Sequence, residues 1–277
     1  LALRSLTQAL DLLQTAQVEV MVIDDAALAL TAYDRPALRP LDRLTVLIRP
    51  EQHHKAYKAL QGGGWKASKW IPSRRRPYTE SLSFTDANQV LLIMRWFAVD
   101  RRCAPGIDND LWSRIIAHTD AQGNPIPVIA PADQLVLSAS RLPTAWSSPC
   151  PSLRVADALT LIQKQPLDWS QVVASAIHYR LTLQLYHLLA LIALPDPSDP
   201  ALADVMRSLS ATPTSWMLRA ENGALQRRAT LPGWESHLIR WWLASDGLRH
   251  VSQGARYFWR WFNLPVPPIP RLRKQSA

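Results

Sequence analysis

The stretch EVMVIDDAALALTAYDRPALRPLDRLTVLIRPE, from Glu19 to Glu51, decides the fold of this 277-residue chain. It opens with a short β-branched run that ends at Ile23, and an alanine-rich run of helical character follows as far as Tyr33. Prolines then mark a turn, and a second β-rich run leads to Arg49-Pro50-Glu51. The pattern predicts a strand, a helix, a loop and a second strand, which together form a β-α-β unit.

Short motifs in this stretch resemble a family of uncharacterised bacterial nucleotidyltransferases, a branch of the polymerase-β-like superfamily. The motifs are Asp24-Asp25, where the family has Lys-Gly, then Tyr33, Arg39-Pro40 and the run Leu47 to Glu51. Further along, the likeness continues through Trp96, Leu111-Trp112, Asp157 and Leu167-Asp168-Trp169, so that it covers roughly residues 1–195. The resemblance implies an α+β fold, with a mixed sheet and flanking helices, followed by a helical C-terminal region.

The resemblance also locates the metal-binding carboxylates of the family. Two aspartates, two apart on one strand, hold Mg²⁺ against a triphosphate in the family, and they fall here on Arg43 and Thr45. The third acid falls on Ile93, and a neighbouring histidine falls on Arg95. Arginine repels a cation, and threonine offers only a neutral hydroxyl. The comparison therefore predicts a retained fold with a degenerate catalytic carboxylate motif.

The first functional hypothesis is a pseudoenzyme with a nucleotidyltransferase fold. If basic and neutral side chains have replaced the acids, the former active-site cleft would bind an anion without a metal or any other cofactor. The ligand would be a nucleotide, another phosphorylated molecule or a protein partner. The residues expected to bind it are Arg39, Arg43, Thr45 and Arg95.

A second hypothesis keeps the enzyme active with a relocated Mg²⁺ site. Asp24 and Asp25 end the first strand and Asp42 begins the second, so these three candidate catalytic carboxylates could converge on a cation. Strand alternation, however, sends Asp42 to the face opposite Arg43 and Thr45 unless the register shifts by one residue. Acids at strand ends are also common as solvated turn or cap residues.

A third hypothesis is a basic nucleic-acid or membrane-surface binder. The formal net charge is +9. The segment from Trp65 to Tyr78 interleaves aromatic rings with lysine and arginine, which suits a nucleic-acid strand, and an Arg/Trp-rich segment near the C-terminus suits a membrane interface. No helix-turn-helix, zinc-finger or ribonucleoprotein signature supports this hypothesis.

The chain is expected to divide into an α/β core over residues 1–130, a helical domain over 131–262 and a Pro-rich basic tail over 263–277. Its longest apolar run, Leu181 to Leu194, is too short to cross a bilayer, so we expect no transmembrane segment and take cytoplasmic residence as the default. Two cysteines are too few for a disulfide framework.

The remaining elements follow from periodicity and turn signals. Helices are predicted at Leu1–Ala16, Gln52–Gln61, Asp108–Thr119 and Leu181–Leu194, with others that start near Pro131, Leu153 and Asp168. A hairpin is predicted over Glu80–Thr85 and Gln89–Val99, and a short strand over Ile126–Ile129.

Overall fold

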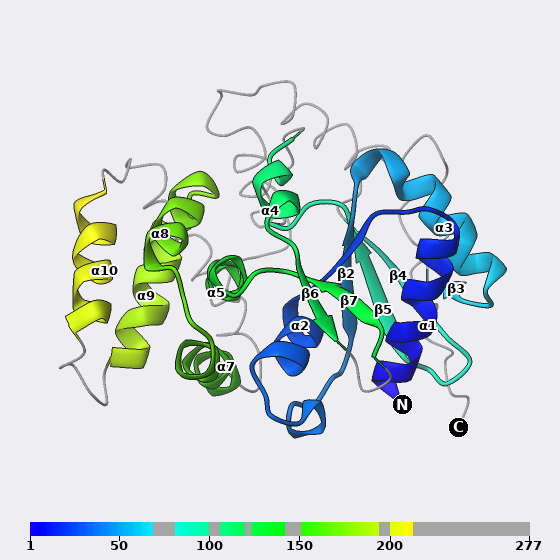
Figure 1. Ribbon diagram of the computed structural model, residues 1–277, viewed down its shortest axis with the longest axis horizontal. Helices are drawn as coiled ribbons and strands as arrows, with labels where there is room; N and C mark the ends of the chain where they lie inside the picture. Colours follow the sequence, from blue (N-terminus) through cyan, green and yellow to red (C-terminus); the bar gives the residue numbers. More distant parts are fainter. Residues whose placement is uncertain (69–80, 100–105, 120–122, 142–150, 194–199, 213–277) are drawn as a thin grey trace, which may run out of the picture.

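The computed structural model describes residues 1–68, 81–99, 106–119, 123–141, 151–193 and 200–212, which form a β-sheet with helices on both faces (Figure 1). Within these ranges the sheet has seven strands in the order β3-β4-β5-β2-β1-β7-β6. They are β1 (Val20–Ile23), β2 (Leu44–Ile48), β3 (Lys66–Ala67), β4 (Ser81–Thr85), β5 (Leu91–Arg95), β6 (Ile116–Thr119) and β7 (Pro125–Val128). β1 pairs with β7, and β2 with β5, in parallel, whereas the other pairs are antiparallel. The predicted α+β class with a mixed sheet is confirmed.

The helices form two groups around the sheet (Figure 1). One face carries α1 (Ala2–Thr15) and α3 (His53–Gly62), and the other carries α2 (Asp24–Thr31) and α5 (Pro131–Ser140). Beyond α5 lies a helical layer of α7 (Pro151–Lys164), α8 (Trp169–His178), α9 (Thr182–Ala193) and α10 (Pro200–Ala211). Shorter turns of helix are α4 (Asn109–Ser113), η1 (Pro36–Leu38) and η2 (Pro50–Gln52). One face of the sheet is thus covered by two helices, and the other by two helices with the helical layer of α7 to α10 beyond them.

Burial differs between the centre and the edge of the sheet. Every residue of β1 and β2 is buried, because helices cover both faces of these central strands. β4 alternates between half-buried and buried residues, as expected of a strand covered on one face only. The half-buried side of β4 and β5 carries Ser81, Ser83 and Ile93. This partly open face is where a ligand could approach the sheet.

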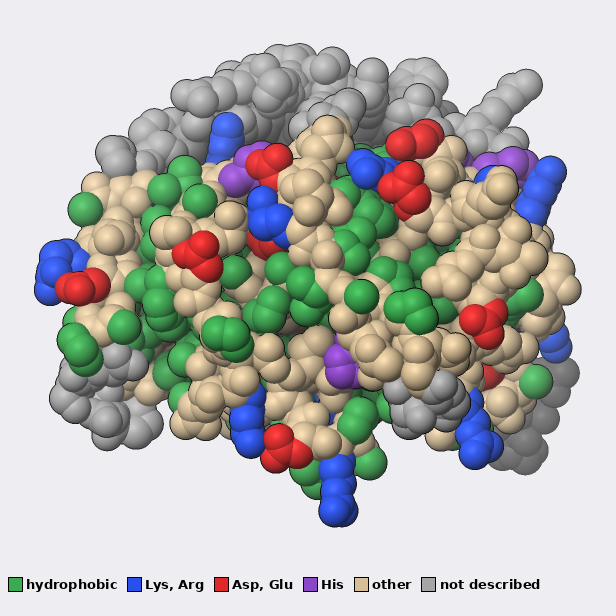
Figure 2. All heavy atoms as spheres, viewed as in Figure 1, with side chains coloured by type: hydrophobic (Ala, Val, Ile, Leu, Met, Phe, Trp, Pro, Cys, Tyr) green, Lys and Arg blue, Asp and Glu red, His purple; other side chains and the backbone are tan. Residues whose placement is uncertain are grey.

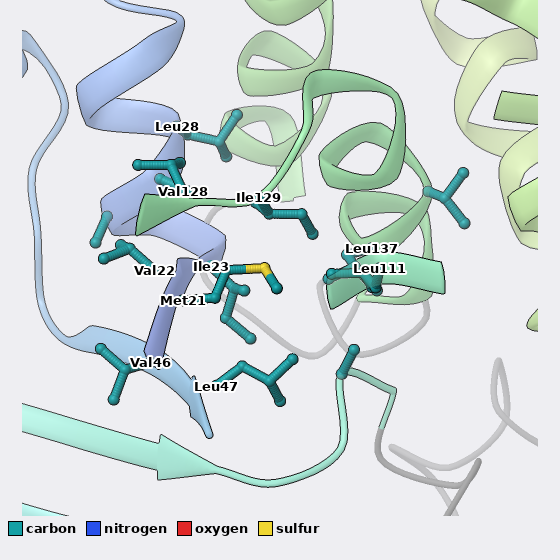
Figure 3. Close-up of a cluster of buried hydrophobic side chains, with 14 of the residues drawn as sticks. Met21, Val22, Ile23, Leu28, Val46, Leu47, Leu111, Val128, Ile129 and Leu137 are labelled. Atoms are coloured by element: carbon teal, nitrogen blue, oxygen red, sulfur yellow. The ribbon is translucent and has the colours of Figure 1, made fainter. Parts of the chain in front are cut away.

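One hydrophobic cluster joins the sheet to the helical layer. Figure 3 shows Met21 of β1 and Leu47 of β2 in the same cluster as Leu111 of α4 and Leu137 of α5. Each of these four side chains is at most 1% exposed. The described residues on either side of position 130 therefore share a core, although the predicted domain boundaries stay a prediction.

Most predicted elements are confirmed, with two errors. The strand, helix and strand of the first stretch are present, but β1 and β2 pair antiparallel, so they do not form the predicted β-α-β unit. Asp108–Thr119 is not one helix, because α4 ends at Ser113 and β6 begins at Ile116. Ile116 to Thr119 alternate between half-buried and exposed, and β7 supplies a partner along their whole length. Strand pairing therefore overrides the weak helical pattern of this segment.

The basic aromatic segment is only partly described. Trp65 is 2% exposed, so its ring belongs to the core and does not present a stacking surface. Residues 69–80 lie outside the described ranges, as do both cysteines, residues 194–199 and the whole of 213–277.

Two further observations bear on the membrane and polyanion hypotheses. Among the described helices, none has the length and apolarity needed to cross a membrane. On the face shown in Figure 2, basic and acidic side chains are interspersed and do not gather by sign.

Candidate functional site

The backbone register brings together the positions at which the family resemblance places the metal-binding carboxylates. Ile23, Thr45 and Ile93 are Cα partners across β1, β2 and β5, and Ser83 of β4 continues the row. Partners in neighbouring strands present their side chains to the same face. Thr45 and Ile93 therefore lie next to each other, as a shared metal site requires, but neither carries an acid.

Thr45 is the most unusual member of this row. It is 1% exposed, and its Oγ1 has no hydrogen-bond partner among the described residues. A buried hydroxyl without a partner costs free energy, so native proteins seldom retain one without a reason. The row thus contains one buried hydroxyl that lacks a hydrogen-bond partner among the described residues.

Arg43 immediately precedes β2, two residues before Thr45. Its side chain is 37% exposed, and its Nε lies 3.9 Å from Oδ2 of Asp25, in the first turn of α2. This is a long ion pair at the edge of the site. Arg43 is therefore both reachable from solvent and weakly held.

Asp25 is buried within a cluster of arginines and does not face a cation site. It accepts hydrogen bonds from Arg39 Nη2 at 3.1 Å, from Arg154 Nη2 at 3.3 Å and from Arg154 Nη1. Burial raises the pKa of Asp25, but the hydrogen bond from Arg154 and the charges of Arg154, Arg39 and Arg141 outweigh that effect and hold the pKa below its ordinary value. Asp25 is accordingly ionised and already neutralised by the protein.

Asp157 of α7 holds Arg39 from the other side. It accepts bonds from Arg39 Nε at 2.7 Å and Nη2 at 2.9 Å, and from Tyr33 Oη at 2.8 Å. The remaining nitrogen of Arg39, Nη1, donates to the Pro40 carbonyl. Arg39, expected to bind ligand, therefore has every guanidinium nitrogen engaged within the protein and is 4% exposed.

Asp24 is likewise engaged. Its carboxylate pairs with Arg141 after α5, and its carbonyl accepts a bond from Gln134 Nε2 at 3.2 Å. Its φ of 62° lies in the left-handed region that L-residues seldom adopt, although aspartate tolerates it better than most. This conformation turns the chain directly from β1 into α2.

Asp42 is exposed and precedes β2 by two residues. No group of three or more histidine, cysteine or acidic side chains that could hold a metal ion occurs within the described ranges. The residues to which the resemblance assigns the metal site, Arg43, Thr45 and Ile93, do not fit Mg²⁺, which requires oxygen ligands and favours carboxylates. One more carboxylate, that of Asp108, lies close enough to Arg95 for the arginine charge to lower its pKa, but Asp108 is bonded to other groups of the protein.

Arg95, expected to bind ligand, is 5% exposed and donates from Nε to the Phe97 carbonyl at 3.3 Å. Asp108 accepts bonds from Tyr179 Oη at 2.7 Å and from the Ala98 amide at 3.1 Å. Burial raises the pKa of Asp108, and the hydrogen bond from Tyr179, the Ala98 amide bond and the charge of Arg95 only partly offset this. Arg95 is therefore a buried positive charge that acts on its neighbours without being exposed to solvent.

Sequence reasoning did not identify Arg141 and Arg154. Both lie more than 110 residues from the aspartates they bind, and helical periodicity carries no information about such pairs. The one local signal is the spacing of Arg154 and Asp157, which lie three apart on α7.

The motifs that carry the family resemblance meet in space. Tyr33 and Arg39 both bind Asp157. Likewise, the Arg49 guanidinium lies 4.7 Å from the ring centroid of Trp112, a cation–π contact. The resemblance therefore rests on residues that hold the sheet and the helices together.

Two solved structures are similar to this chain. A lincosamide antibiotic adenylyltransferase with bound lincomycin is 15% identical, and the match covers 58% of this chain and 97% of that chain with a TM-score of 0.41. An antigenic nucleotidyltransferase-like protein from Paracoccidioides brasiliensis is 14% identical, and the match covers 78% of this chain and 96% of that chain with a TM-score of 0.46. No curated protein matches the chain.

A family model described as "Uncharacterised nucleotidyltransferase" matches residues 1–195. This span is more than half of the chain and includes the sheet, α2 and the arginine cluster around Asp25. The chain therefore belongs to this family of uncharacterised nucleotidyltransferases.

Proposed function

We propose that this protein keeps the nucleotidyltransferase fold without its metal-dependent chemistry, and that it binds the phosphates of a nucleotide or another phosphorylated ligand on the sheet face beside α2. The observation that carries the proposal is the row of former carboxylate positions. In place of acids, this face presents the half-exposed Arg43 and the unpaired hydroxyl of Thr45. Such groups donate hydrogen bonds and attract anions.

The relocated metal site is disfavoured on energetic grounds. Recruiting Asp25 to a cation would remove the partner of the largely buried Arg154 and one partner of the buried Arg39. Breaking a buried ion pair costs roughly 3–5 kcal/mol. A cation at the first turn of α2 would also oppose the positive end of the helix dipole. The helix dipole instead favours an anion at this place.

The described residues suggest distinct parts in such binding. Arg43, with 37% of its side chain exposed, would contact a phosphate directly, and Thr45, which is 1% exposed, would donate its hydroxyl to a phosphate oxygen only after the groups that cover it move aside. Arg95 would contribute its charge through the protein, since it is 5% exposed. Arg39 would hold α2 against α7 and would not touch the ligand.

The proposal is tested by calorimetric titration of each nucleoside triphosphate, once with Mg²⁺ and once with a chelator. We expect the same affinity under both conditions for at least one nucleotide. Arg43→Ala should weaken that binding about tenfold, the effect of one lost charge-assisted hydrogen bond. Arg207→Ala, which removes an arginine of 75% side-chain exposure on α10, should change nothing.

Two results would overturn the proposal. One is nucleotide binding that requires Mg²⁺. The other is Mg²⁺-dependent labelling of an acceptor that is abolished by Asp42→Asn or Asp24→Asn, which would establish the relocated catalytic site.

A further inference from the structure

Four guanidinium groups from separate parts of the chain converge on the first turn of α2. Arg39 follows η1, Arg43 precedes β2, Arg141 follows α5, and Arg154 lies on α7. The carboxylates that face them are Asp24 and Asp25 of α2 and Asp157 of α7. Four positive charges against three negative charges leave the cluster with one excess positive charge.

The first turn of α2 is itself suited to an anion. The first backbone N–H groups of a helix lack intrahelical acceptors, and the helix dipole places partial positive charge there. Helix N-termini that also carry arginines are common phosphate sites. In this protein two carboxylates lie in that turn: Asp24, which pairs with Arg141, and Asp25, which faces Arg43 and Arg154.

An independent observation also points to a ligand at this place. Among the described residues, the buried Thr45 Oγ1 has no hydrogen-bond partner, and it belongs to β2, the strand that α2 contacts. Thr45 is the Cα partner of Ile23, the residue that directly precedes α2. The unpaired donor therefore lies beside the same helix end as the arginines.

An incoming anion can take the place of Asp25 without leaving the buried arginines unpaired. Arg39 keeps two hydrogen bonds to Asp157 when Asp25 is absent, and Asp157 is fully buried. Arg154 also lies 3.9 Å from Asp157. By contrast, Arg43 and Arg154 are 37% and 17% exposed, so solvent reaches them. These two arginines are the ones that could exchange Asp25 for an incoming anion.

We propose that Asp25 is a built-in occupant of a phosphate site formed by Arg43, Arg154 and the N-terminus of α2, and that it competes with the phosphates of the ligand. This inference deepens the proposed function, on which it rests, by naming the contact that limits affinity. The site therefore inhibits itself, because phosphate can bind Arg43 and Arg154 only when the carboxylate of Asp25 moves away from them.

The test is calorimetric titration with inorganic pyrophosphate. Asp25→Asn keeps the shape of the side chain and removes its charge, and we expect it to bind pyrophosphate about tenfold more tightly than the unmodified protein, because the ligand gains charge-assisted hydrogen bonds. Asp25→Ser, which offers a hydroxyl suited to a helix start, should show the same gain. Thermal unfolding followed by circular dichroism establishes that each variant is folded.

A matched control is Asp133→Asn. Asp133 is also buried in the first turn of a helix, α5, and also binds an arginine, Arg114, through two hydrogen bonds. Among the described residues, Asp133 pairs with one arginine, whereas Asp25 pairs with three. Replacing Asp133 should therefore leave pyrophosphate affinity unchanged. Adding Arg154→Gln to Asp25→Asn should abolish the gain.

The outcomes separate this inference from the proposed function. Folded Asp25→Asn and Asp25→Ser proteins that bind pyrophosphate no better than the unmodified chain would overturn the inference, even where metal-independent nucleotide binding stands. An equal gain in Asp133→Asn would overturn it as well. Arg154→Gln in the unmodified chain gives a further check, because pyrophosphate affinity should fall and an unaltered value contradicts the site. A gain in Asp25→Asn together with Mg²⁺-dependent nucleotide binding would support the phosphate site and refute the proposed function.

Discussion

Two buried aspartates, Asp25 and Asp108, show how neighbouring charge decides the behaviour of a carboxylate. Both are desolvated, which raises the pKa. Arginines surround Asp25 and bring its pKa below the ordinary value, whereas Asp108 is bonded to neutral donors of Tyr179 and Ala98 and its pKa stays raised. The two groups should therefore affect stability with opposite dependence on pH.

The sign of each effect follows from proton binding. Asp25 contributes stability above the ordinary aspartate pKa of about 3.9, and this contribution is lost as the pH falls through its lowered folded pKa. The contribution of Asp108 is complete below about pH 3.9 and is lost as the pH rises through its raised folded pKa. The measurement is the urea midpoint of unfolding between about pH 2 and pH 6. We expect the midpoint to rise less steeply with pH in Asp25→Asn than in the unmodified protein, and more steeply in Asp108→Asn. Parallel slopes in all three proteins would contradict this assignment.

Local sequence signals specify most single elements. Asp168 was expected to begin a helix, and its side chain accepts bonds from the Ser170 and Gln171 amides at the start of α8. The hairpin of β4 and β5 and the helix predicted over Gln52–Gln61, which is α3, were expected for similar local reasons. β6 was missed, because its identity as a strand depends on β7 and not on its own four residues.

Asp86 shows how one turn residue joins two elements. Its Oδ1 accepts the amides of Asn88 at 2.9 Å and Val90 at 2.8 Å, which closes the β4–β5 turn. Its Oδ2 accepts the hydroxyl of Ser5 in α1 at 2.6 Å. The turn and the N-terminal helix therefore share one carboxylate.

We expect Asp86→Ala to lower the free energy of unfolding by about 2 kcal/mol, because three donors lose their acceptor and the Ser5 hydroxyl is buried. The measurement is the urea midpoint at constant slope. The control is Asp11→Ala, on the exposed side of α1, the helix that contains Ser5, and it should leave the midpoint unchanged. Equal midpoints for the two variants would show that the Asp86 bonds contribute nothing net.

At the scale of the whole molecule, the sheet and the helical layer are joined by apolar packing and by the cluster around Asp157. The mixed sheet and the family could be predicted from short motifs, because these motifs encode strands, turns and caps locally. The arginine cluster could not, since Arg141 and Arg154 reach Asp24 and Asp25 only after the helical layer has packed. Sequence reasoning could therefore name Asp24 and Asp25 as candidates but not their partners.

We expect Asp157→Ala to destabilise the protein by about 3 kcal/mol or more, because Arg39 and Tyr33 lose a fully buried partner. Amide hydrogen exchange should become faster in both α2 and α7, since the lost bonds join these helices. Asp204→Ala removes an exposed ion pair with Arg207 and should have no measurable effect. Exchange that rises in α7 alone would show that the cluster does not couple the two layers.

β1 connects to α2 without a loop, since Ile23 ends the strand and Asp24, with its left-handed backbone conformation, begins the helix. One additional amino acid at this junction would rotate the helix by about 100° around its axis and advance it by about 1.5 Å. Asp25 would then swing away from Arg39 and Arg154, and the side chains of this helix, which are buried from Asp24 to Leu30, would meet different neighbours. The length of this junction is thus constrained more tightly than the identity of the amino acids within it.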